Sequence, residues 1–289
     1  LAAGGNTGSV TNVETIVGAS GADTLTIIAA LTSASVDLAA GSDTITLANG
    51  TNSASVTNVE TITGGTGADT ITLSGTITGT SVDLDAGSDT LALGAGPVTA
   101  TLANVETTNG GSGVDTITLS AGVTNTSIDL GGGSDVLTLA AAGSTFTAAN
   151  VETLTGGAGV DTVTLGTAAS SATIDLAGGN DVLTLANATN GASVANVETI
   201  TGGTGADTIT LGSALSNSTT VDLAAGNDRL TLAAGGNTGS VTNVETIIGA
   251  SGADTLTIIA ALTSASVDLA AGADTITLAN GTNSASVTN

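Results

Sequence analysis

The side chains able to do chemistry in this chain are almost all carboxylates, arranged in two rows. The 289 residues include 25 Asp and Glu but a single basic residue, Arg229. The first row follows a β-branched residue every 23 residues, with one step of 24: Glu14, Asp37, Glu60, Asp83, Glu106, Asp129, Glu152, Asp175, Glu198, Asp222, Glu245 and Asp268. The second row closes a glycine turn: Asp23, Asp43, Asp69, Asp89, Asp115, Asp135, Asp161, Asp181, Asp207, Asp228, Asp254 and Asp274.

Repeated carboxylates of this kind can bind cations but do not make a catalytic site. The chain has no His, Cys or Tyr, so no pairing of a nucleophile with a base can be assembled. We therefore expect that the protein is not an enzyme. The formal net charge of −24 disfavours nucleic acid and anionic membrane surfaces as partners. No apolar run reaches the length of a membrane-spanning helix, which predicts no membrane insertion.

Short strands must position the two rows. After every turn aspartate, the second and fourth residues are aliphatic and the first and third are mostly Thr, as in Thr24–Ile27 and Thr70–Leu73. This alternation is typical of half-buried strands, and the β-branched residue before each first-row acid forms a second inward row. Because so short a repeat cannot enclose a core alone, stacking must bury it. The sequence predicts an all-β parallel β-solenoid, like a β-roll or β-helix, with about twelve 23-residue coils.

The repeats are nested. Coils with a long turn after Asn-Val-Glu-Thr alternate with coils having a short turn after Val-Asp-Leu, which defines a 46-residue unit. Residues 1–58 recur at 232–289 with two changes, at 17/248 and 42/273. We expect residues 1–289 to form one continuous solenoid, a fragment of a longer repeat protein that self-associates end to end or laterally. An asparagine row is expected to be structural: Asn12, Asn58, Asn104, Asn150, Asn196, Asn243 and Asn289.

Stacking turns the acids into ladders of like charge that need compensation. Two unit charges about 5 Å apart repel by roughly 0.8 kcal/mol even in water. Turn amides can bond some aspartates. Divalent cations can neutralise others, because Ca²⁺ binds carboxylate and carbonyl oxygens in glycine-rich loops. Two interpretations stay open for the turn aspartates, either structural turn formation or Ca²⁺ binding, whereas for the first row simple solvation is favoured.

The long turns carry a known motif. Gly64–Thr72 fits the pattern G-G-x-G-x-D-x-U-x, and so do 110–118, 156–164 and 202–210, whereas 18–26 and 249–257 have Ala at the second position. The chain therefore resembles the RTX (repeats-in-toxin) calcium-binding proteins, and most of all the RTX-like repeats of large bacterial surface proteins. The short turns keep only G-x-D-x-U.

The resemblance implies a secreted β-roll in which turn aspartates and glycine-loop carbonyls hold Ca²⁺. The residues carried over as candidate metal ligands are Asp23, Asp69, Asp115, Asp161, Asp207 and Asp254, with Gly64, Gly67, Gly110, Gly113, Gly156, Gly159, Gly202 and Gly205. We expect an extracellular structural protein at a bacterial cell surface: a rigid rod serving as filament, sheath, surface-layer component or adhesin stalk. The alternative is an ice-binding solenoid that uses its Thr-x-Thr rows, which Ala92, Val136, Val182 and Arg229 interrupt.

Overall fold

The computed structural model describes residues 1–288, which form strands, turns and connecting segments without a helix. Accordingly, no described helix is long and apolar enough to cross a membrane. The chain divides into two compact units, Leu1–Ala140 and Ala141–Asn289, and each is described separately.

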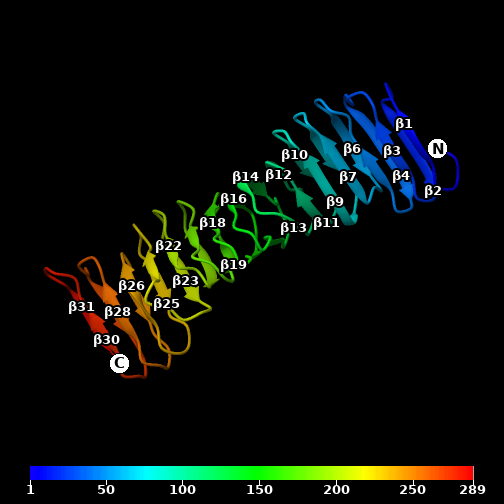
Figure 1. The fold of residues 1–289 in the computed structure, drawn as a ribbon. Coiled ribbons are helices and arrows are strands. Elements are labelled where there is room, and N and C mark those ends of the chain that lie inside the picture. The colour runs from blue at the N-terminus through cyan, green and yellow to red at the C-terminus, as the bar shows by residue number, and fades with distance from the viewer. Residues whose placement is uncertain (289) are drawn as a thin grey trace. The chain divides into compact units, whose positions relative to one another are not determined.

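In the first unit the strands alternate along the chain between two parallel sheets, so that each coil contributes one strand to each sheet (Figure 1). One sheet contains β1 (Thr7–Val10), β3 (Thr24–Ile27), β5 (Thr44–Thr46), β7 (Thr61–Gly65), β9 (Ile77–Asp85), β11 (Val98–Ala103), β13 (Thr116–Leu119) and β15 (Val136–Thr138). The other contains β2 (Thr15–Ser20), β4 (Ala34–Ala40), β6 (Ser53–Thr57), β8 (Thr70–Leu73), β10 (Thr90–Leu93), β12 (Thr107–Asn109) and β14 (Thr124–Asp129).

The second unit repeats this arrangement. One sheet contains β16 (Thr145–Ala149), β18 (Thr162–Leu165), β20 (Val182–Thr184), β22 (Thr199–Thr201), β24 (Thr220–Asp222), β26 (Thr238–Thr242), β28 (Thr255–Ile258) and β30 (Thr275–Thr277). The other contains β17 (Thr153–Thr155), β19 (Ser170–Asp175), β21 (Gly191–Ala195), β23 (Thr208–Leu211), β25 (Arg229–Thr231), β27 (Thr246–Ile248), β29 (Ala265–Asp268) and β31 (Ala285–Thr288).

The predicted inward rows form the core between the two sheets. In β8, Ile71 and Leu73 are buried, whereas the two threonines of the strand face outward. The β-branched row is also buried, as at Val59 and Val82, although Val13 in the first coils is 37% exposed. Alternation of aliphatic and hydroxyl side chains therefore decides which face of each strand is covered.

The parallel β-solenoid is confirmed, but its coils are shorter than predicted. Thr24 pairs with Thr44, and the preceding Asp23 bonds Asp43, 20 residues further along the chain. Thr44 pairs with Thr61, and the preceding Asp43 bonds Glu60, 17 residues further along. Asp207 N donates to Asp228 Oδ1, 21 residues further along the chain, and this longer step contains the one residue inserted into the repeat. The prediction of 23-residue coils is wrong, and the described chain has a few more coils than the expected twelve.

The difference arises in stretches such as Ser53–Thr57, which the pattern after the turn aspartates does not include. Each 46-residue unit forms five strands rather than four, because stretches such as Ser53–Thr57 pair as well and bury Ala54 and Val56. Five strands make two and a half coils, so an average coil spans two fifths of the unit instead of half of it. Equivalent strands of successive units consequently lie in opposite sheets, as β3, β8 and β13 do. The turn aspartates that precede these strands therefore alternate between the two sides of the stack.

Candidate functional site

Each turn aspartate lies directly before a strand, and all of them except Asp274 are buried. Asp69 precedes β8 and Asp89 precedes β10, and both side chains are at most 1% exposed. The second row therefore lies inside the stack. Burial of so many carboxylates is costly unless each one finds hydrogen-bond donors or a counter-ion.

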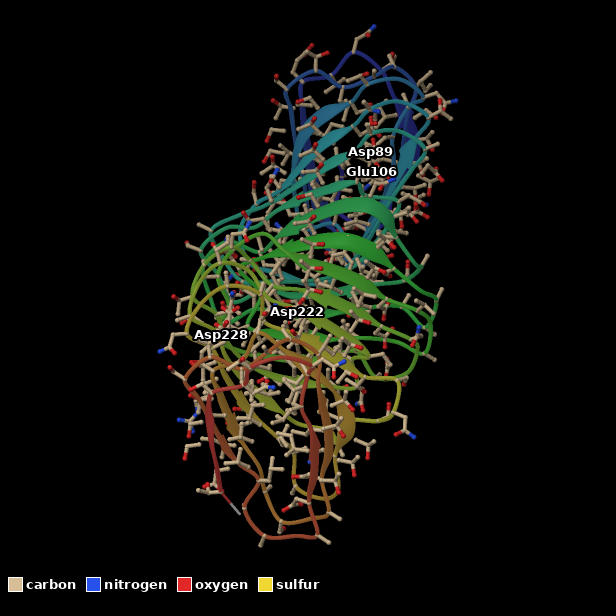
Figure 2. The ribbon with its side chains drawn as sticks, turned by 90° about the vertical axis from the view of Figure 1, so that its left-hand side faces the viewer. Asp89, Glu106, Asp222 and Asp228 are labelled. Carbon is tan, nitrogen blue, oxygen red and sulfur yellow. The ribbon has the colours of Figure 1, made fainter. Side chains whose placement is uncertain are left out.

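Backbone amides of successive coils donate to these carboxylates. Asp69 N donates to Asp89 Oδ1 at 2.7 Å, and Asp89 N donates to Glu106 Oε2 at 2.8 Å. Figure 2 labels Asp89 and Glu106, which lie together in the first unit. We call each such series a carboxylate ladder. The ladders with two aspartates followed by a glutamate are Asp23–Asp43–Glu60, Asp69–Asp89–Glu106, Asp161–Asp181–Glu198 and Asp207–Asp228–Glu245.

An asparagine precedes the first aspartate of several ladders, and Asn52, Asn190 and Asn237 are buried. Asn190 Nδ2 donates to Ala186 O at 2.9 Å, to Ala188 O at 2.8 Å and to Asp207 Oδ1 at 2.8 Å. Its Oδ1 accepts from Ala169 N at 3.0 Å. The side chain thus joins three consecutive coils. Asparagines with the same contacts to a turn aspartate are Asn6, Asn52 and Asn237.

Sequence reasoning missed both the asparagines and the glutamates of the ladders. The favoured interpretation of the first row as solvated is wrong for four of its glutamates, because Glu60, Glu106, Glu198 and Glu245 accept backbone N–H groups of turn aspartates, whereas Glu14 is exposed. A signal was present in the sequence, at a spacing of 17 residues. An asparagine precedes many long-turn aspartates by this distance, and a glutamate follows nearly every short-turn aspartate by the same distance. A spacing of 17 residues is one of the two step lengths between neighbouring coils. The spacing becomes informative only when these lengths are known.

The first-row aspartates stabilise turns instead. Asp222 Oδ1 accepts from Ala224 N at 2.9 Å and from Asn243 Nδ2 at 2.8 Å. Ala224 has φ 64° and Asn243 has φ 52°, left-handed conformations that local hydrogen bonds help to hold. In the predicted asparagine row, Asn58, Asn104, Asn196 and Asn243 thus have a structural role, in which their amides donate to first-row aspartates rather than to one another. Asn289, the last member of that row, lies outside the described residues.

The ladders leave carboxylate oxygens without partners. No hydrogen bond reaches Oδ2 of Asp23, Asp43, Asp69, Asp89, Asp115, Asp181, Asp228 or Asp254, although these atoms are buried. Burial raises the pKa of Asp89 and Asp181, against the effect of backbone N–H donors and with added repulsion from neighbouring carboxylates. The same causes raise the pKa of Asp228 to about 6. Asp23 differs, because hydrogen bonds from Asn6 lower its pKa.

The predicted glycines allow neighbouring coils to approach. A Cβ on Gly202 would lie 2.6 Å from the carbonyl carbon of Leu223, and Gly64, Gly110 and Gly156 meet the following coil in the same way. A Cβ on Gly67, Gly113, Gly159 or Gly205 would instead strike the backbone of the preceding loop. Glycine at these positions therefore has a packing reason, whichever atoms bind a cation.

The donor atoms present fit Ca²⁺. All candidate ligands are carboxylate or carbonyl oxygens, which Ca²⁺ prefers, and buried oxygens without partners need such a charge. Among the described residues, no three Asp, Glu, His or Cys side chains form a metal-binding cluster. Main-chain carbonyls must therefore complete any site. The structure buries Asp23, Asp69, Asp115, Asp161, Asp207 and Asp254 at such turns, and their role as ligands stays a prediction.

Comparison with known families agrees with this geometry. Residues 57–75 and 195–214 match the family described as RTX calcium-binding nonapeptide repeat (4 copies). These segments contain the long turns that end at Asp69 and Asp207, one in each unit. No curated protein matches the chain. Repeats of this family are typical of secreted bacterial proteins and are generally not catalytic. The chain thus carries RTX-like β-solenoid repeats, and the ion that such repeats bind is Ca²⁺.

Proposed function

We propose that this chain is an extracellular structural element, in which Ca²⁺-stabilised coils build a rigid rod within a filament, sheath, surface layer or adhesin stalk. The observation that carries the proposal is the repetition of the carboxylate ladder along the chain, in both units. Each ladder ties consecutive coils together, and the same contacts recur from one ladder to the next. Such repetition suits a role in which length and stiffness matter more than a single recognition site.

Chemistry supports a non-enzymatic role. His, Cys and Tyr are absent, and the one basic residue, Arg229, is exposed on β25. Every carboxylate pair in a ladder recurs elsewhere, so no pair is singled out for acid–base work. We therefore propose that the chain is not an enzyme.

Charge supports a location in which divalent cations are abundant. A net charge of −24 opposes association of copies unless cations neutralise it. Extracellular modules bind Ca²⁺ with dissociation constants of about 10⁻⁴ to 10⁻³ M. Sites of this affinity suit an extracellular location, where bound Ca²⁺ would neutralise the negative charge. We propose a secreted, cell-surface protein that associates with further copies of itself, end to end or laterally, when Ca²⁺ is present.

Calcium is expected to raise the melting temperature of the purified chain, and chelator to lower it. At 100 times the dissociation constant, one site contributes about 2.7 kcal/mol of stability. For a chain of this size that corresponds to a rise of several degrees, about 2–4 °C per kcal/mol. Scanning calorimetry with CaCl₂ and with EDTA measures this shift. Negative-stain images of the parent assembly would be expected to show rods or layers with Ca²⁺, and compact globules would contradict the structural role.

The threonine rows favour ice binding as a second candidate. Thr24, Thr44 and Thr61 pair in register on one outward face, and the threonines two residues later form a parallel rank. Such ranks repeat at the strand spacing of about 4.8 Å, which produces a regularly spaced hydroxyl surface. Purified protein is then expected to show thermal hysteresis and shaped ice crystals. Absence of hysteresis at high protein concentration would remove this candidate.

A further inference from the structure

Asparagine followed directly by glycine occurs four times in the chain, and such pairs can modify themselves. The glycine nitrogen loses its proton to solvent and attacks the side-chain Cγ of the asparagine. The bond from Cγ to Nδ2 breaks, ammonia leaves and a succinimide ring remains. Water then opens the ring to aspartate or to isoaspartate, in which the side-chain carbon has become part of the main chain. The reaction requires an asparagine side chain that can turn and a glycine nitrogen that is not hydrogen-bonded.

The fold blocks this reaction at two of the four pairs. Asn190 is 1% exposed, and Gly191 N donates to a carbonyl oxygen of the neighbouring coil at 2.8 Å. Asn109 is exposed but belongs to β12, and Gly110 N donates to Asp129 O. Attack at either place would first require a coil to open locally.

The other two pairs lie in exposed loops that follow β5 and β30. Asn49 and Asn280 have exposed side chains. Neither Gly50 N nor Gly281 N donates a hydrogen bond to any of the described residues. A Cβ on Gly50 would meet only Ala30 Cβ, at 3.8 Å, and a Cβ on Gly281 would meet no atom within 4 Å. Both requirements of the reaction are therefore met, with room for the ring.

The second unit contains a matched loop that lacks the glycine. In residues 48–52 and 186–190 the last side chain is a buried asparagine, whose amide donates to the carbonyl oxygens of the first and third residues. The second residue is an exposed asparagine in both loops. In the second unit, however, Asn187 is followed by Ala188, whose N–H donates to Ala186 O at 2.8 Å. The two loops therefore differ at the attacking nitrogen.

We propose that Asn49 and Asn280 are sites of spontaneous deamidation in the folded protein, whereas Asn109, Asn187 and Asn190 are protected. The products are aspartate and isoaspartate, so each event adds a negative charge to an already acidic chain. This modification is separate from the proposed role in a rod and does not require Ca²⁺.

Modification at Asn49 would also disturb a carboxylate ladder. Asn52 Nδ2 donates to Ala48 O and to Gly50 O, both at 2.9 Å. The same amide donates to Asp69 Oδ1 at 2.8 Å. Isoaspartate places an extra main-chain carbon between the two carbonyl groups, so the amide cannot keep all of these bonds. We therefore expect faster hydrogen exchange in β6 and β8 after long incubation.

Peptide mapping of the incubated full chain tests the assignment. A protease that cleaves after glutamate places Asn49, Asn109 and Asn280 in different peptides, and Asn187 and Asn190 share another. After incubation in mildly alkaline buffer, mass spectrometry measures deamidation, and an isoaspartate-specific methyltransferase labels the product. Conversion at Asn49 and Asn280 should be roughly tenfold or more faster than at the other three, which react only after local opening. In urea, the four asparagine–glycine pairs should react at similar rates. Equal rates at Asn49 and Asn109 in the folded chain would overturn the proposal.

Two substitutions provide a gain and a loss of the site. Ala188→Gly gives the second unit the sequence of the first, so Asn187 should then deamidate within a few-fold of the rate at Asn49. An unchanged rate at Asn187 would overturn the role assigned to the glycine nitrogen. Asn49→Ala removes the site, and the equivalent loop at 233–237 already has alanine at this place. Exchange in β6 and β8 of this variant should not change on incubation, and circular dichroism checks that both variants fold.

Discussion

Replacing Asn190 by alanine is expected to lower the free energy of unfolding by about 3–5 kcal/mol, among the largest effects a single substitution can have. The amide is 1% exposed and joins three coils. Its removal leaves Ala186 O, Ala188 O and Asp207 Oδ1 without that donor and Ala169 N without its acceptor. Water cannot readily reach these groups, so the cost of desolvation stays uncompensated.

Asn187→Ala is the matched control, since Asn187 is an exposed residue of the same loop. Urea denaturation followed by circular dichroism should show a loss of less than about 0.5 kcal/mol for this variant. Hydrogen exchange should locate the damage of Asn190→Ala in β21 and β23, because a solenoid opens locally. Similar stabilities for the two variants would show that the buried amide does not hold the coils together.

Cation-free protein is expected to be more stable near pH 5 than near pH 7.5. Burial raises the pKa of Asp228 from 3.8 to about 6, so its protonated form is favoured in the folded state. That contribution is fully present below pH 3.8 and is lost as the pH rises through about 6. Burial also raises the pKa of Asp43, Asp89, Asp115, Asp161 and Asp181, which adds to the same trend.

Calcium should cancel this trend, because cation binding favours the ionised carboxylates and releases their protons. Melting temperatures in EDTA should therefore fall by several degrees between pH 5 and pH 7.5, whereas with CaCl₂ they should change little. Asp228→Asn should flatten part of the EDTA profile. Asp23 has the opposite sign, because hydrogen bonds from Asn6 lower its pKa and its contribution is lost in strong acid. A profile in EDTA that rises steadily towards pH 7.5 would contradict the buried-carboxylate account.

Much of the fold could be read from residue patterns. Alternation of aliphatic residues and threonine identified the strands after each turn, and Ile71 and Leu73 are indeed buried. Most of the β-branched row before the first-row acids was also correctly placed inside, although Val13 is exposed. The additional strand at Ser53–Thr57 could not be predicted. Its small alternating side chains bury little apolar area even when they face the core, so the segment resembles a loop in the sequence. Missing that strand led directly to the wrong coil length.

The candidate site was only half visible for the same reason. The turn aspartates and glycines could be named, because glycine-rich loops closed by aspartate are a local pattern. Their hydrogen-bond partners lie 17, 20 or 21 residues away, on the neighbouring coil. Neither Asn190 nor Glu198 could be assigned a role until the stacking register was known.

The sequence by itself thus determined that carboxylates recur in rows, that short strands stack in parallel and that oxygen-rich turns suit Ca²⁺, since these features depend on composition and short-range periodicity. Only the tertiary structure decided the length of each coil, the burial of the turn aspartates, and which of their oxygens lack a partner. The physical reason is that a carboxylate's surroundings are supplied by adjacent coils, and a small difference in coil length changes every neighbour it meets.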